Sequence, residues 1–118
     1  MVEATTELPI LDSARIEEVF DGDTSACREI LEMFIADARQ QTDGVQASVG
    51  GRQFEKIAGV AHTLKGAAAN VGAMRLAASA RNLETAAREH DTARSTRAVS
   101  DIATELRLLT EEAARSVS

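Results

Sequence analysis

The chain has 118 residues, enough for one domain but too few for two independent hydrophobic cores. It is 44% hydrophobic, 27% charged and only 3% aromatic, a composition that is ordinary for a globular protein and favours helix packing over strands. The formal net charge of −6 argues against a nucleic-acid-binding protein, and no apolar run approaches the length of a membrane span.

The cysteine content and the N-terminus indicate a cytoplasmic protein. Cys27 is the single cysteine, so it cannot form an internal disulfide, and we expect it to be a small buried apolar residue. The N-terminal sequence MVEATTELPI lacks the basic region of a secretory signal. We therefore expect a flexible lead-in over residues 1–9 and one helical domain over residues 10–118.

Two helices are predicted in the first half of the chain. Asp12 or Ser13 can cap a short helix that ends at Asp21-Gly22. Asp23 or Thr24 can cap a long helix that is broken at Gly50-Gly51. The apolar residues at helical spacing are Ile16, Val19 and Phe20 in the first, and Cys27, Ile30, Leu31, Phe34, Ala38, Val45 and Val49 in the second.

Three more helices are predicted in the second half. The third runs from about Gln53 to Asn70 and ends with Asn70 or Gly72 in the left-handed conformation. The fourth stops near His90-Asp91, and the fifth starts after Asp91 or Thr92. Their apolar stripes are Ile57, Val60, Ala61, Leu64, Ala68 and Val71, then Leu76, Ala80, Leu83 and Ala87, then Val99, Ile102, Leu106, Leu109 and Ala113. Short connections between long amphipathic helices predict an all-α fold, an antiparallel up-down four-helix bundle with a short additional N-terminal helix.

His62 falls on the side of the third predicted helix that faces away from its apolar stripe. With Leu64 at 0° and about 100° per residue, His62 lies near 160°, so a buried core histidine is disfavoured. The same outward half contains mostly small residues, namely Glu55, Ala58, Gly59, Lys65, Gly66 and Ala69.

The small residues around His62 indicate a surface that is kept open for a partner. A solvated helix face normally carries Glu, Lys and Arg, and each glycine inside a helix costs about 0.5–1 kcal/mol relative to alanine. Gly66 lies one turn after His62, where a side chain would crowd the imidazole. Lys65 can hold an anion beside the ring. An exposed, nucleophilic histidine next to an ammonium group suits a phosphate carrier.

The segment His62-Thr63-Leu64-Lys65-Gly66 resembles the HxLKG signature of histidine-containing phosphotransfer (HPt) domains. The similarity extends through residues 67–72, Leu76-Ala77 and Leu83-Glu84. It implies a cytoplasmic helical bundle that carries phosphoryl groups in the phosphorelays of two-component signalling, with His62 as the phosphoacceptor. It implies response-regulator receiver domains or a hybrid sensor histidine kinase as partners, and Mg²⁺ on the receiver. The chain would have no cofactor or metal of its own and would not be a free-standing kinase.

Glu84 occupies the place where HPt domains usually have a glutamine or glutamate bonded to the second imidazole nitrogen. A carboxylate on Nδ1–H would fix the tautomer and strengthen Nε2 as the nucleophile. The alternative is an ordinary ion pair with Arg88 one turn on, and the two are compatible. Arg81 and Arg88 lie outside the apolar stripe and are candidates for the docking surface or for phosphate contact, the alternative being solvated arginines.

The charge distribution favours an acidic partner for the middle of the chain. Residues 52–90 contain six positive and three negative residues, which leaves −9 for the remainder. Chance clustering on solvated faces explains this equally well. No motif surrounds His90, and its place at the end of the fourth helix is explained by the favourable effect of a cation at a helix C-terminus.

Two other functions stay open from the residues alone. One is a non-catalytic helical adaptor that binds a signalling partner through the His62 face without phosphorylation. The other is a metal-binding bundle, which is disfavoured because His62 and His90 are the only histidines and are not spaced three or four residues apart. We expect a monomer.

Overall fold

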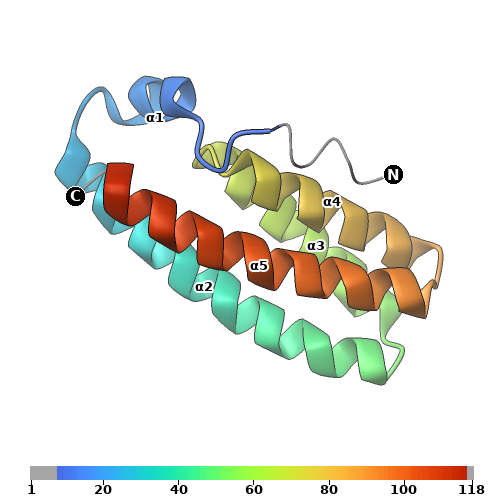
Figure 1. Cartoon of the computed structure of the whole chain (residues 1–118). Helices are drawn as coiled ribbons and strands as arrows, with labels where there is room; N and C mark the ends of the chain where they lie inside the picture. The colour runs from blue at the N-terminus through green and yellow to red at the C-terminus, as the bar shows by residue number, and fades with distance from the viewer. Residues whose placement is uncertain (1–7, 117–118) are drawn as a thin grey trace.

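The computed structural model describes residues 8–116, which form helices and contain no strand. The helices are α1 (Ser13–Phe20), α2 (Thr24–Gly50), α3 (Phe54–Asn70), α4 (Met74–Arg88) and α5 (Thr92–Ser116). In Figure 1 the helices α2 to α5 run up and down as antiparallel neighbours, and α1 lies across one end of the bundle. The predicted fold is confirmed. Most of the expected lead-in, residues 1–7, lies outside the described residues.

The predicted acidic caps begin three of the helices. Asp12 Oδ1 accepts from the backbone N–H groups of Ala14 and Arg15 at the start of α1. Asp23 Oδ1 accepts from Ala26 N–H at 3.0 Å, and Asp91 Oδ1 accepts from Arg94 N–H at 2.9 Å. Each bond satisfies an N–H group that has no partner inside its helix.

The turn between α3 and α4 anchors the N-terminal segment. Gly72 takes φ 81°, as predicted for the residue that ends α3, and its carbonyl accepts from Asp12 N–H at 2.8 Å. The Pro9 carbonyl accepts from Arg75 N–H at 3.3 Å. The chain before α1 is therefore tied to the start of α4. No helix within the described range is long and apolar enough to cross a lipid bilayer.

The core lies between α2, α3, α4 and α5, and α3 and α4 make the most extensive contact of any helix pair. Cys27 is buried as predicted, and burial raises the pKa of its thiol. Two apolar residues assigned to core stripes are instead exposed: Val19 is 46% exposed and Ile30 43%. Val19 belongs to α1, which buries no residue, and Ile30 is rotated by about 100° from the buried Leu31.

Ala58 is also placed wrongly by the sequence prediction, which put it on the outward face near His62. It is 5% exposed and belongs to the core. Ala58 and Lys65 are two helical turns apart on the same flank of α3. Lys65 bonds Glu84 on α4, so this flank is the one that α4 covers. Ala58 is therefore a packing residue and not part of the open surface.

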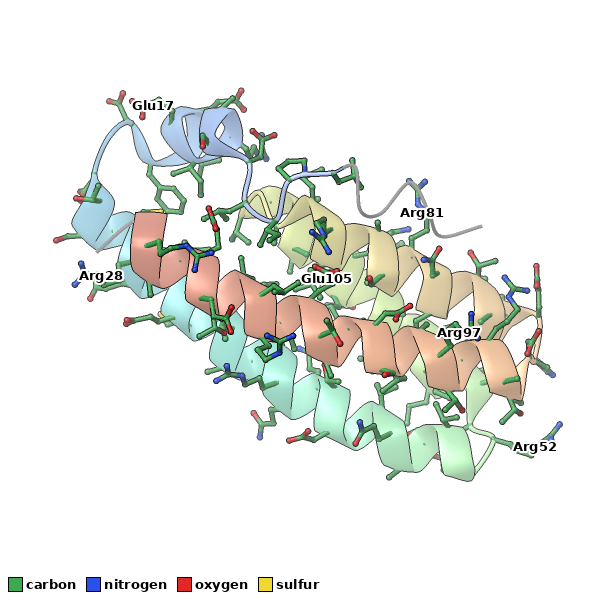
Figure 2. All side chains as sticks on the ribbon, viewed as in Figure 1. Glu17, Arg28, Arg52, Arg81, Arg97 and Glu105 are labelled. Carbon is green, nitrogen blue, oxygen red and sulfur yellow. The ribbon has the colours of Figure 1, made fainter. Side chains whose placement is uncertain are left out.

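A buried ion pair joins α4 to α5. Arg75 Nη2 donates to Glu105 Oε2 at 2.9 Å, and Glu105 reaches from α5 toward α4 (Figure 2). Neither Arg75 Nε nor Glu105 Oε1 has a hydrogen-bond partner among the described residues. The pair is thus partly satisfied, and it links α4 to α5.

Candidate functional site

His62 projects from the second half of α3, and its side chain is 65% exposed. The buried residues of this half, Ala61, Leu64 and Ala68, face the core and orient the helix. The imidazole consequently points away from the bundle, as its phase in the helix predicted.

Glu84 on α4 lies directly beside the ring. Its Oε2 is 3.1 Å from His62 Nδ1, and the residue is 7% exposed. The same carboxylate accepts from Lys65 Nζ through Oε1 at 2.9 Å and from Arg88 through Oε2, at 2.7 Å from Nη2 and 3.3 Å from Nε. The predicted contact with His62 and the alternative pair with Arg88 therefore both exist.

The charge state of Glu84 determines the tautomer of His62. The Lys65 ammonium and then the Arg88 guanidinium lower the pKa of the Glu84 carboxyl to about 2, although burial acts in the opposite direction. An ionised carboxylate only accepts hydrogen bonds, so the proton of the neutral ring belongs on Nδ1. Nε2 then carries the free lone pair on the exposed side of the ring.

Lys65 and Arg88 both form ion pairs with Glu84. The Lys65 ammonium is bonded to Glu84, and its contact with a bound anion beside His62 stays a prediction. Arg88 is bonded to the same carboxylate although its side chain is 62% exposed. Arg81, by contrast, points away from the bundle (Figure 2) and makes no hydrogen bond or ion pair with any described residue.

The glycines on the His62 face leave open space. A Cβ placed on Gly59 or Gly66 would have no heavy atom within 4 Å other than those of neighbouring residues and the local helix backbone. The expectation that a side chain at Gly66 would crowd the imidazole is therefore wrong for a methyl group. Ala69 is half-buried and packs against the core, so it borders this surface rather than forming it.

His90 has a partner that the sequence did not reveal. It follows the end of α4 with φ 55°, and its ring stacks on Phe54 with centroids 4.8 Å apart. The Arg52 guanidinium carbon lies 5.5 Å from the centre of the Phe54 ring. This cluster joins the α2–α3 and α4–α5 turns. From the sequence, His90 was explained only as a cation at the end of a helix, and its contact with Phe54 was not predicted. Within residues 8–116, no group of three or more His, Cys, Asp or Glu side chains could hold a metal ion.

A helical bundle with an exposed histidine whose Nδ1 is held by a buried carboxylate has the architecture of a histidine phosphotransfer domain. A family model described as Hpt domain matches residues 29–116, and the chain belongs to this family. It is accordingly a histidine phosphotransfer protein of phosphorelay signalling.

The crystal structure of histidine-containing phosphotransfer protein B (HptB) from Pseudomonas aeruginosa PAO1 has a similar fold. Its sequence is 22% identical, and the superposition has a TM-score of 0.80 over 91% of this chain and 96% of that chain. At this level of identity the likeness concerns the fold. No curated protein matches the chain.

Proposed function

We propose that His62 is the phosphoacceptor and that it exchanges a phosphoryl group with the aspartate of response-regulator receiver domains. The observation that carries the proposal is the contact of Glu84 Oε2 with His62 Nδ1. This contact leaves Nε2 as the nucleophilic nitrogen on the exposed side of the ring.

The transfer requires no proton movement at the moment of attack. The Nε2 lone pair forms a bond to phosphorus while the bond between phosphorus and the aspartyl oxygen breaks, and the aspartate leaves as a carboxylate with the electron pair. The ring gains positive character and keeps its Nδ1 proton, which remains bonded to Glu84. Return of the group to an aspartate reverses these steps.

The chain would act as a carrier whose contribution is positioning and charge. Lys65 lies next to His62 on the surface and brings positive charge to the region where a phosphoryl group would sit. Mg²⁺ bound by the receiver domain would neutralise charge on the phosphoryl oxygens, so the chain would need no cofactor of its own.

We expect the chain to be a cytoplasmic monomer. Its expected partners are receiver domains, a hybrid sensor histidine kinase, or both. Support comes from the positive charge of residues 52–90, which contain the whole Glu84 cluster. An acidic receiver pocket that holds Mg²⁺ complements such a surface.

Phosphotransfer from a ³²P-labelled receiver domain tests the proposal. We expect the wild-type protein to take up label that is acid-labile and base-stable, as phosphohistidine is, and the His62→Gln variant to take up none while its helicity is unchanged. His90→Gln is the matched control, because His90 is exposed but contacts Phe54 and not Glu84. Equal labelling of the wild type and His62→Gln would contradict the proposal. Receiver binding without any labelling would favour the adaptor.

A further inference from the structure

Two donors share one oxygen of Glu84. His62 Nδ1 and the Arg88 guanidinium both contact Oε2, whereas Lys65 Nζ contacts Oε1. Arg88 makes the shorter contact, at 2.7 Å against 3.1 Å for His62. The oxygen that contacts the imidazole is therefore also bonded by Arg88, which makes no hydrogen bond with the ring itself.

We propose that Arg88 is a positioning residue for phosphotransfer, which holds Glu84 Oε2 against His62 Nδ1 and thereby keeps the lone pair on Nε2. The inference rests on the proposed role of His62. It assigns to Arg88 an action through Glu84, in place of a direct contact with a partner or with phosphate.

The geometry of the carboxylate supports this assignment. A bond from Lys65 to Oε1 alone leaves the carboxylate free to rotate about its terminal torsion, which has a broad energy profile. Bonds from Lys65 to Oε1 and from Arg88 to Oε2 hold both oxygens, so the plane of the group is fixed. Arg88 is one turn after Glu84 on α4, so the same helix sets both residues.

The surroundings distinguish this pair from an ordinary surface ion pair. Exposed pairs contribute little because water solvates both groups, but the Glu84 side chain is only 10% exposed. Two nitrogens of Arg88 converge on one of its oxygens. Arg81 provides the contrast, since it lies two turns earlier on the same face of α4 and bonds no described residue.

Two measurements on Arg88→Met, Arg88→Lys and Arg81→Met test the inference. Methionine keeps much of the length of the side chain and removes its charge, and Arg81→Met makes the same change of charge on the same face without touching Glu84. The ¹⁵N chemical shifts of the His62 ring report the tautomer, and phosphotransfer kinetics at varied receiver concentration separate kcat from KM.

We expect Arg88→Met to shift His62 from the Nδ1–H toward the Nε2–H tautomer and to lower kcat roughly tenfold, as loss of a supporting contact commonly does, with KM unchanged. Arg88→Lys should recover part of both. Arg81→Met should leave the tautomer of His62 unchanged, and any contribution of Arg81 to docking should change KM and not kcat. The inference would be overturned if Arg88→Met keeps the wild-type tautomer. It would also be overturned if the loss in Arg88→Met appears only in KM, because that result would indicate docking and not positioning. If even the wild type takes up no label, the proposed function fails, and the tautomer shift alone still decides whether Arg88 positions the ring.

Discussion

His62 and Glu84 are 22 residues apart in the chain, and yet His62 Nδ1 lies 3.1 Å from Glu84 Oε2. The contact exists because α3 and α4 are antiparallel neighbours that pack along their length. Neither helix alone provides both His62, the proposed nucleophile, and the carboxylate that contacts it, so the proposed chemistry depends on the packing of α3 against α4.

Replacement of Glu84 by glutamine should slow phosphotransfer about tenfold. Glu84 accepts from Lys65 on one oxygen and from His62 and Arg88 on the other, whereas an amide has only one acceptor oxygen. The amide is neutral and offers weaker compensation for the positive charge that develops on the ring. Initial rates of label uptake measure the effect. Glu55→Gln is the control, because Glu55 is exposed on α3 and undergoes the same change of charge. Equal rates in the two variants would contradict the orienting role of Glu84.

The stability of the protein should depend on pH through Glu84. Lys65 and then Arg88 lower the pKa of this carboxyl from 4.5 to about 2 in the folded state. A lowered folded pKa means that the stabilisation is complete above about pH 4.5 and is lost as the pH falls toward 2.

Urea unfolding of the wild type and Glu84→Gln over this pH range measures that dependence. We expect the wild-type free energy of unfolding to fall more steeply than that of the variant between pH 4.5 and about pH 2, with the two curves parallel at higher pH. Parallel curves throughout would show that the ion-pair cluster does not lower the carboxyl pKa.

Much of the fold could be predicted from local features of the sequence. Asp12, Asp23 and Asp91 act within three residues of their own position, so the caps are visible as short patterns. The outward direction of His62 follows from its phase relative to Leu64 within one helix. Glu84 was placed beside the ring by the family resemblance, because no pattern within α4 indicates which residue faces α3.

The features that were missed depend on how helices pack. A helical wheel separates the buried from the exposed side of α3, but it does not tell which flank α4 covers, so Ala58 was placed on the surface. Arg75 and Glu105 are 30 residues apart, and their contact depends on the axial position of α5 relative to α4. The stacking of His90 on Phe54 likewise depends on where two separate turns meet.

The pair of Arg75 and Glu105 should show the behaviour of a buried charge. Arg75→Met is expected to cost about 3 kcal/mol in the free energy of unfolding, because it leaves the Glu105 carboxylate buried without a partner. The double variant Arg75→Met/Glu105→Leu should recover much of this loss, since it removes both charges. Denaturant unfolding of the three proteins checks this, and a double variant less stable than Arg75→Met would contradict it.

We expect the glycine at position 66 to favour receiver docking and to lower the stability of the folded protein. A Cβ at this position meets open space, so Gly66→Ala should stabilise the isolated protein by about 0.4–1 kcal/mol through the lower entropy of the unfolded chain. Because Gly66 is exposed one turn from His62, the added methyl group would lie where a receiver domain must approach closely. We therefore expect weaker receiver binding together with a higher melting temperature.

Gly44 supplies the matched control for this prediction. It is an exposed glycine within α2, and a Cβ there also meets nothing within 4 Å. Gly44→Ala should raise the melting temperature by a similar amount and leave receiver affinity unchanged, because α2 does not contribute to the Glu84 cluster. Melting curves and titration with a receiver domain measure the two properties separately. If Gly66→Ala binds the receiver as tightly as Gly44→Ala does, then open space at position 66 is not what the partner requires, and docking must rest on the residues around Glu84.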